Sequence, residues 1–227
     1  MGPVPTMQMS PATVMAPHAE GTPEPAVPNP VPNLGLVRAQ LAAAASSVSG
    51  PQRAEEYLDL LERSPRALYR DGGPVHLTAS AIVVDAPGEQ VALVWHRKGE
   101  FWVQPGGHLE PGEIDLELAA RREVAEETGL EELERVGDGP AMLHQHDLSA
   151  AFGRCRAHWD VQYLLRAPAP ASAVPLRASD ESPKVRWVPW PRRPGRAGRD
   201  LSALPAGTVA DLPETLAALA RLVDAQR

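Results

Sequence analysis

Acidic side chains fall on the packing face of a predicted helix near the middle of this chain of 227 residues. A helical rotation of about 100° per residue from Asp115 onward places Glu123 and Glu127 on one face. The apolar positions Leu116 and Ala119 share that face. Carboxylates there repel one another and lose hydration, so soluble helices normally carry them on the solvated side. Because a divalent cation would remove both penalties, the segment predicts a metal site.

A loop rich in glycine and proline, at residues 104–112, precedes this helix. Gly106 and Gly107 allow the backbone to approach a ligand closely, so a carbonyl oxygen of the loop can join the carboxylates. Oxygen donors suit Mg²⁺ or Mn²⁺ rather than zinc. Mg²⁺ held by few carboxylates shares its other positions with water and substrate phosphates, which predicts chemistry on a phosphate or diphosphate.

The segment 107–130 resembles the Nudix box, G-x5-E-x7-R-E-U-x-E-E-x-G-U, where U is a bulky aliphatic residue. The matching residues are Gly107, Glu113, Arg122, Glu123, Val124, Glu126, Glu127, Gly129 and Leu130. One departure is that eight residues, not seven, separate Glu113 from Arg122. Because an insertion within a helix would rotate everything beyond it by about 100°, we expect the extra residue near positions 113–115. The extra residue puts the pairing of Glu113 with Arg122 in question. It leaves the second half of the box, which carries the metal-binding glutamates, intact.

The resemblance implies a hydrolase that uses Mg²⁺ or Mn²⁺ to cleave the diphosphate linkage of a nucleoside diphosphate attached to another group. It implies Glu123 and Glu127 as principal metal ligands, completed by the carbonyl of Gly107. Glu126 is implied to bind a further ion or to activate water, and Arg122 to orient the glutamates. The catalytic candidates are therefore Arg122, Glu126 and Glu127.

Four residues beyond the box are further candidates. By resemblance, Glu181 supplies another metal-binding or basic carboxylate, although a solvated loop acid explains it equally well. His158 and Asp160 share one face of a predicted strand, and this polar row either lines a substrate cleft or faces solvent at a sheet edge. Trp102, beside the glycine loop, is a candidate for stacking on a nucleobase.

Cys155 is the only cysteine, which excludes an internal disulfide and is compatible with a reducing cytoplasm. With no catalytic partner identifiable in the sequence, we interpret it as incidental. His144 and His146 lack a third partner at metal-ligand spacing, so we interpret them as surface or loop residues. Two other functions stay open: a Nudix-fold regulator that senses a nucleotide without turnover, and an isopentenyl-diphosphate-type isomerase, whose cysteine–glutamate chemistry Cys155 matches poorly.

The net charge of −7 argues against a general polyanion-binding surface. We therefore expect a small diphosphate molecule as partner, not nucleic acid. No apolar run approaches the roughly 20 residues of a membrane-spanning helix, and we expect a cytoplasmic protein.

Residues 1–33 form a proline-rich tail that is expected to be disordered. Helices predicted at 35–48 and 52–63 form an extension over residues 34–73, which docks as a cap, mediates a homodimer or binds a partner. The resemblance implies an α/β/α sandwich with a mixed β-sheet over residues 74–227. Its strands are predicted at 76–84, 90–96, 101–103, 140–148, 157–166 and 184–188, with a mobile surface segment at 191–208 and a closing helix at 215–225.

Overall fold

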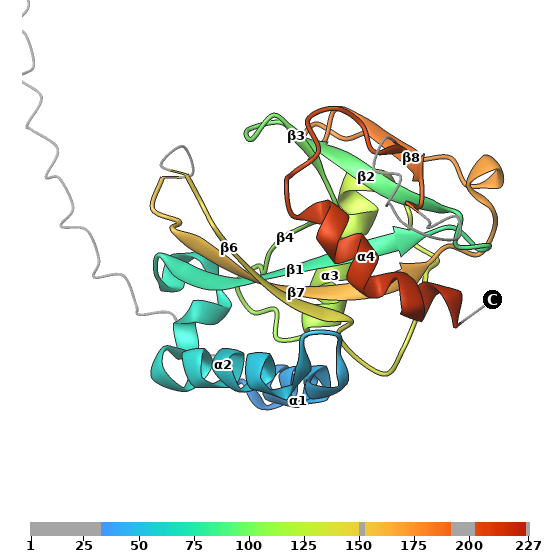
Figure 1. The fold of residues 1–227 in the computed structure, drawn as a ribbon. Helices are drawn as coiled ribbons and strands as arrows, with labels where there is room; N and C mark the ends of the chain where they lie inside the picture. Colours follow the sequence, from blue (N-terminus) through green and yellow to red (C-terminus); the bar gives the residue numbers. More distant parts are fainter. Residues whose placement is uncertain (1–32, 150–152, 192–202, 226–227) are drawn as a thin grey trace, which may run out of the picture. The chain divides into compact units, whose positions relative to one another are not determined.

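The computed structural model describes residues 33–149, 153–191 and 203–225, and Figure 1 shows their fold. The α-helices are α1 (Gly35–Ala43), α2 (Gly50–Arg63), α3 (Leu116–Thr128) and α4 (Leu212–Asp224). The strands are β1 (Val75–Val84), β2 (Gln90–His96), β3 (Phe101–Val103), β4 (Gly106–His108), β5 (Glu134–Arg135), β6 (Met142–Asp147), β7 (Ala157–Arg166) and β8 (Val185–Pro189). The predicted tail, apart from its last residue, and most of the segment 191–208 lie outside the described residues.

The described strands form one mixed sheet, as predicted. The order along its main path is β3-β2-β1-β7-β5, while β4 pairs with β1, β6 with β7 and β8 with β2. β1 and β7 are parallel over their whole length, from Val75 opposite Ala157 to Val84 opposite Arg166. The other pairs are antiparallel. The long β1–β7 pair is therefore the centre on which the other strands are built.

Alternating side chains of β1 serve two hydrophobic cores, because successive residues of a strand point to opposite faces. Leu77 and Ala79 belong to the core that includes α3, whereas Ile82 and Val84 belong to the core that includes α4. Figure 1 shows α3 and α4 on the two sides of the sheet. The predicted α/β/α sandwich is confirmed.

The two N-terminal helices pack on the same side of the sheet as α3. Val37 and Leu41 of α1, and Tyr57 and Leu61 of α2, are fully buried in that core. Their burial agrees with the interpretation of residues 34–73 as a docked cap. The first helix is shorter than predicted, since it ends at Ala43 and continues only as a 3₁₀ turn.

Polar contacts fix the position of the cap. The Tyr57 hydroxyl lies 2.9 Å from the carbonyl oxygen of His144 and 3.1 Å from that of Asp160, on neighbouring strands β6 and β7. The Gln40 amide donates to the Asp115 carboxylate at 2.7 Å and accepts from the Leu116 backbone N–H at 2.9 Å. The cap therefore contacts both the sheet and the beginning of α3. No helix among the described residues has the length and apolar character needed to cross a membrane.

We predict that Tyr57→Phe lowers the free energy of unfolding by about 1–2 kcal/mol, because two buried carbonyl groups lose their partner. Urea denaturation measures the change. Tyr163→Phe is the matched control: the Tyr163 hydroxyl is buried without a hydrogen-bond partner among the described residues, so its removal should leave stability unchanged or raise it. Equal losses in both variants would show that the Tyr57 hydrogen bonds contribute nothing specific.

Candidate active site

The acidic helix α3 begins and ends at residues suited to those positions. The Asp115 carboxylate accepts from the backbone N–H groups of Glu117 and Leu118, which makes Asp115 the N-cap. Gly129 closes the helix in the left-handed conformation, with φ of 74°. Because the helix begins only at Leu116, the extra residue of the box lies in the preceding loop, as predicted.

Two box glutamates are buried, which matches their predicted place on the packing face. Glu123 is 9% exposed and Glu127 is 6% exposed, whereas the Glu126 side chain is 53% exposed. Glu127 accepts from the Gly106 backbone N–H at 2.9 Å and from the Ser182 hydroxyl at 2.6 Å. Two inward carboxylates and one at the rim are therefore arranged on a single helix.

Arg122 connects the carboxylates of the box. Its guanidinium makes two hydrogen bonds to Glu113, at 2.9 and 3.1 Å, so the pairing questioned from the sequence is present. Its Nη1 donates to Glu123 at 2.9 Å and to Glu126 at 3.0 Å. Its Nη2 donates to the His108 carbonyl oxygen at 3.0 Å. One cation thus holds three glutamates and the glycine loop in a fixed arrangement.

Burial and neighbouring charges shift the pKa values of these groups. Burial, together with the charges of Glu127 and Glu126, raises the pKa of Glu123 to about 7 against the lowering effect of Arg122. Burial also raises the pKa of Glu127, against hydrogen bonds from Ser182 and Gly106. For Glu113, burial acts upward, but hydrogen bonds from Arg122 and the Glu110 backbone outweigh it and lower the pKa. The buried pair therefore lacks sufficient positive charge from the protein.

The backbone at Gly107 lies directly against the Glu123 carboxylate. A Cβ atom at this position would lie 2.5 Å from Glu123 Oε1, so any side chain would displace the carboxylate. Residues 106–108, predicted as an irregular loop, form β4, in which Gly107 is opposite Ala79 of β1. The sheet therefore places the predicted carbonyl ligand beside the predicted metal-binding helix.

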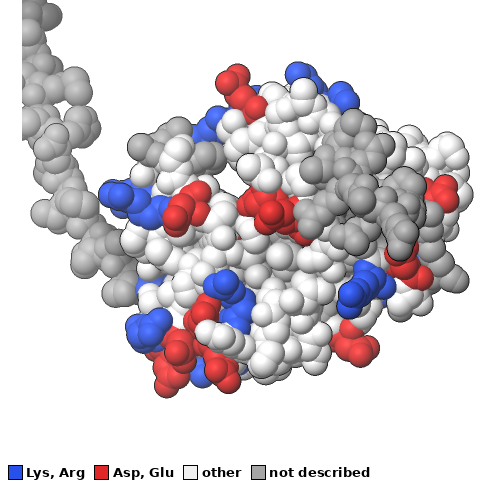
Figure 2. Space-filling view, in the orientation of Figure 1, with Lys and Arg blue, Asp and Glu red and all other residues white. Residues whose placement is uncertain are grey.

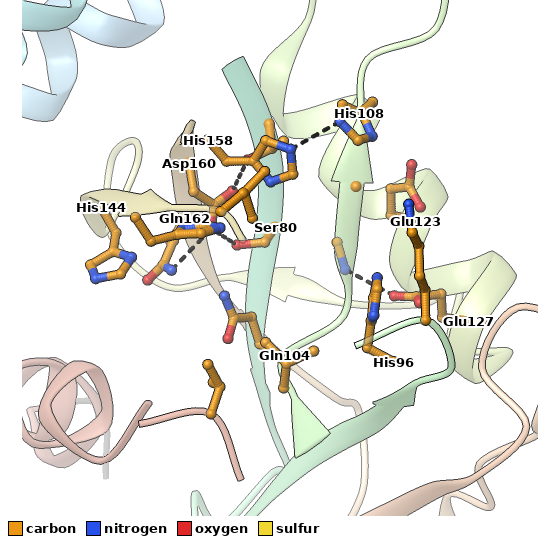
Figure 3. A pocket seen from close by; sticks show the side chains of 18 of the residues that line it. Ser80, His96, Gln104, His108, Glu123, Glu127, His144, His158, Asp160 and Gln162 are labelled. Carbon is orange, nitrogen blue, oxygen red and sulfur yellow. Dashed lines mark hydrogen bonds between the residues drawn. The ribbon is translucent and has the colours of Figure 1, made fainter. Parts of the chain in front are cut away.

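The box glutamates line a cleft of about 990 Å³. Glu123 and Glu127 lie at one side of it, and the polar side chains of β7 lie at the other (Figure 3). Glu126 and the exposed Glu181 also line it, and the charge of Glu181 contributes to raising the pKa of Glu127. This volume is within the range of small-molecule sites.

The polar side chains of β7 (His158, Asp160 and Gln162) line this cleft. They do not lie at a sheet edge, because β7 pairs with β1 on one side and with β5 and β6 on the other. Asp160, 3% exposed, accepts from the Thr78 hydroxyl at 2.9 Å and from the Ser80 hydroxyl at 2.6 Å. Gln162 donates to Asp160 at 3.0 Å, and its own Oε1 is buried without a partner among the described residues. Hydroxyl and amide donors thus neighbour a carboxylate on the cleft wall.

Trp102 does not line the cleft, which corrects the interpretation of this residue as a stacking platform. Its side chain is 4% exposed in the core with α4, with the Arg186 guanidinium carbon 4.3 Å from its ring centroid. Phe101 and Val103 line the cleft instead, since alternate residues of β3 point to opposite faces.

Three histidines and Cys155 form a further group, of which His108 and His158 line the cleft while His76 and Cys155 are buried beside them. Ligand atoms of His76, His108, Cys155 and His158 all lie within 4.8 Å of one another. Burial, followed by neighbouring histidines, lowers the pKa of His108 to about 4 and that of His158 to about 2, and burial also lowers the pKa of His76. The sequence did not predict this group, because its members are far apart in the chain.

His144 and His146 lie on β6 and line the cleft, so they are not simply surface residues. His146 contacts the His158 ring edge-on, with ring centroids 5.3 Å apart. Ser182, the buried partner of Glu127, was also missed. The only sequence signal for it was its place beside Glu181.

On the face drawn in Figure 2, acidic side chains lie at a central hollow, and lysines and arginines form separate small groups.

A family model for the NUDIX domain matches residues 74–200, more than half of the chain. The chain belongs to the Nudix family. The prediction of a Nudix hydrolase is thereby confirmed.

Three solved structures are similar to this chain. A Nudix-family hydrolase from Clostridium perfringens is 20% identical, with a TM-score of 0.50, covering 67% of this chain and 98% of its own. An Ap4A hydrolase from C. elegans is 18% identical, with a TM-score of 0.48, covering 66% and 98%. A bifunctional NMN adenylyltransferase/ADP ribose pyrophosphatase from Francisella tularensis, complexed with AMP and a manganese ion, is 19% identical, with a TM-score of 0.44, covering 74% and 46%.

The raised pKa of Glu123 predicts a pH-dependent stability of the metal-free Nudix protein. The folded state favours the protonated carboxyl, so this stabilisation is present below the ordinary pKa of 4.5 and is lost as pH rises through about 7. Urea denaturation in EDTA from about pH 5 to pH 8 should therefore show the stability of the wild type falling relative to that of Glu123→Gln. The lowered pKa values of His76, His108 and His158 make stability rise with pH, and this contribution cancels in the comparison.

This relative fall is expected because the amide of Glu123→Gln stays neutral over the whole range, whereas Glu123 becomes charged. The control Glu132→Gln, at an exposed position outside α3, should keep the wild-type slope. Identical slopes in the wild type and Glu123→Gln would contradict the assignment of the fall to Glu123.

Proposed function

We propose that this Nudix protein is an Mg²⁺- or Mn²⁺-dependent hydrolase that cleaves the diphosphate linkage of a nucleoside diphosphate attached to another group. The observation that carries the proposal is the pair of buried glutamates, Glu123 and Glu127, with Glu126 at the rim of the same cleft. These carboxylates repel one another and have lost hydration. Among the described residues, Arg122 is the cation that forms ion pairs with Glu123 and Glu126. A hard divalent cation supplies what is missing.

The donor set fits such an ion. The carboxylate oxygens of Glu123, Glu126 and Glu127, together with the Gly107 carbonyl oxygen, are the hard ligands that Mg²⁺ and Mn²⁺ prefer. The clearance at Gly107 supports the fit, because a side chain there would occupy the place of the Glu123 carboxylate. Glu181 lines the same cleft, and we propose it as an additional ligand or base.

Each residue has a separate role in the proposed reaction. When bound, the metal offsets the charge of the diphosphate and lowers the pKa of an attacking water. Arg122 holds Glu113, Glu123 and Glu126 at fixed positions. Glu126, the exposed member, accepts the proton of the water. Glu127 is held in place by hydrogen bonds from Ser182 and Gly106, and its remaining lone pairs would bind the ion.

The cleft opposite the box accommodates the rest of the substrate. We propose that Asp160 binds it there, because Asp160 lines the cleft and accepts hydroxyl donors from Thr78 and Ser80. Hydroxyl groups of a ribose would be similar donors.

We also propose a cytoplasmic location for the protein and residue 74 as the start of its Nudix domain. A homodimer stays a prediction.

Assays of phosphate and nucleotide release test the function. The panel comprises ADP-ribose, dinucleoside polyphosphates, nucleotide sugars and nucleoside triphosphates, each with and without Mg²⁺. We expect Mg²⁺-dependent turnover on at least one class. A folded protein without metal-dependent turnover on any class would refute the proposal and favour a nucleotide-sensing regulator.

We predict that Glu127→Gln lowers kcat by about 10²-fold or more, because a neutral amide weakens the ion site and the reaction depends on the water that the ion activates. Glu126→Gln should act in the same direction. Steady-state kinetics at saturating Mg²⁺ measures both changes. Glu132→Gln, an exposed carboxylate beyond α3, is the control and should retain wild-type rates. In a regulator the glutamate variants would instead change ligand affinity only modestly, without any turnover to lose.

A further inference from the structure

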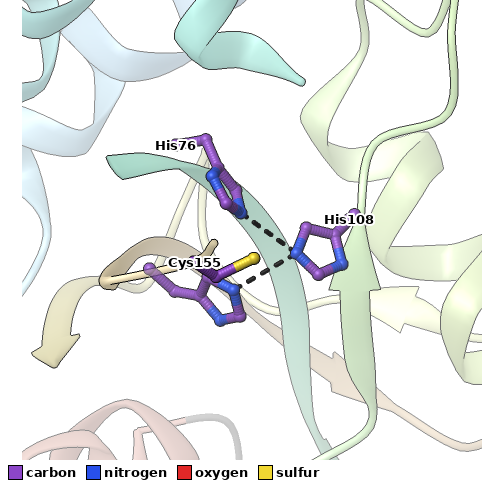
Figure 4. A group of neighbouring side chains, drawn as sticks. His76, His108 and Cys155 are labelled. Atoms are coloured by element: carbon purple, nitrogen blue, oxygen red, sulfur yellow. Dashed lines mark hydrogen bonds between the residues drawn. The ribbon is translucent and has the colours of Figure 1, made fainter. Parts of the chain in front are cut away.

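A second group of potential metal ligands shares only His108, at a variable position, with the Nudix box, and it differs from the box carboxylates in its chemistry. Three imidazoles and one thiol converge there, from His76 on β1, His108 on β4, His158 on β7 and Cys155 just before β7 (Figure 4). The strand pairing brings them together: His76 is opposite His158 in the parallel pair, and His108 is opposite Thr78 in the antiparallel pair. The backbone of the sheet therefore determines their separation.

The distances from His108 to the other two histidines are similar to those between ligands of one ion. His108 Nε2 lies 3.1 Å from His76 Nε2 and 3.2 Å from His158 Nε2. Tetrahedral zinc with Zn–N bonds of about 2.0–2.1 Å places its nitrogens roughly 3.3 Å apart. The separation of the imidazoles is thus close to that of a zinc centre.

Hydrogen bonding supports the same conclusion. His76 Nδ1 lies 2.9 Å from the Gly73 carbonyl oxygen, which can only accept, so Nδ1 carries the hydrogen and Nε2 of the neutral ring carries a lone pair. A backbone carbonyl that orients a histidine in this way is the usual support of a metal-bound imidazole. His108 Nε2 faces two ring nitrogens at once, and a single N–H or lone pair cannot make two good linear bonds to them.

Cys155 brings the number of potential ligands to four, and its Sγ lies within 4.8 Å of each histidine ligand atom. Cys155 is 6% exposed and His76 is fully buried, so both are shielded from solvent. A thiolate adds the negative charge that three neutral imidazoles lack, and nitrogen with sulfur donors selects zinc over magnesium.

We propose that His76, His108, His158 and Cys155 bind one zinc ion, separately from the hard cation of the Nudix box. Four protein ligands leave no open position, so the site is structural rather than catalytic. It ties β1, β4 and the beginning of β7 together at one wall of the cleft. Because His108 directly follows Gly107, the ion also fixes the loop that lies against Glu123. His158 then acts as a zinc ligand, which replaces its predicted role in substrate binding.

Titration of the metal-free full-length protein with Co²⁺, which substitutes for Zn²⁺, tests this inference. The titration is made under reducing conditions with excess Mg²⁺, so that the carboxylate site is occupied. We expect one equivalent of Co²⁺ to give the visible bands of tetrahedral cobalt together with a thiolate-to-cobalt charge-transfer band. Since Cys155 is the only cysteine of the chain, that band reports on this residue alone. One equivalent of Zn²⁺ should then displace the cobalt and raise the thermal unfolding midpoint.

Variants identify the ligands. Cys155→Ser, nearly isosteric, should abolish the charge-transfer band, and His158→Ala should weaken Zn²⁺ binding at least about tenfold. His144→Ala is the matched control, because His144 lies in the same cleft but outside the group, and it should bind Zn²⁺ as the wild type does. Circular dichroism of each metal-free variant checks folding.

Absence of stoichiometric Co²⁺ binding by the folded wild type would overturn the proposal, and so would binding without the charge-transfer band. In either case the contacts are hydrogen bonds between neutral rings. The same titration with Glu127→Gln should be unchanged. Metal binding at the histidines and hydrolysis at the glutamates can therefore fail or succeed independently.

Discussion

The inward position of Glu123 and Glu127 on α3 is the constraint on which the remaining site depends. A helix face packed against a sheet normally carries only apolar side chains, and each buried carboxylate costs several kcal/mol unless it is compensated. Arg122 offsets part of this cost by hydrogen bonds to Glu113, Glu123 and Glu126, and Ser182 with Gly106 offsets part for Glu127. In the proposed function, the remaining negative charge attracts a cation and, through it, a diphosphate.

The central pair of parallel strands, β1 and β7, converts this local arrangement into a cleft. Odd-numbered residues of β1, such as Leu77 and Ala79, fill the core beneath α3, while Thr78 and Ser80 face the cleft and bind Asp160. The same alternation along one strand therefore stabilises the fold and furnishes the polar wall. The cap formed by α1 and α2 supports this wall from behind, since Tyr57 bonds to the backbone of Asp160 itself.

Much of the site was predictable because its determinants are local in sequence. Helical periodicity alone placed Glu123 and Glu127 inward, and the rigidity of a helix required the extra residue to lie before Leu116. The doubt about the Glu113–Arg122 pair arose because spacing does not show how a loop bends. Trp102 was misplaced for a related reason: its position beside the glycine loop was visible, but which face of the short strand β3 it occupies was not.

The sequence by itself determined the acidic helix, its inward glutamates and the family, because these depend on residues within a few helical turns of one another. Only the tertiary structure decided that the polar row of β7 faces the cleft, that Ser182 holds Glu127, and that Cys155 lies among three histidines. Those contacts join residues from strands and loops distant in the chain. Their meeting depends on strand order and register, which are set by how the whole sheet buries its two faces.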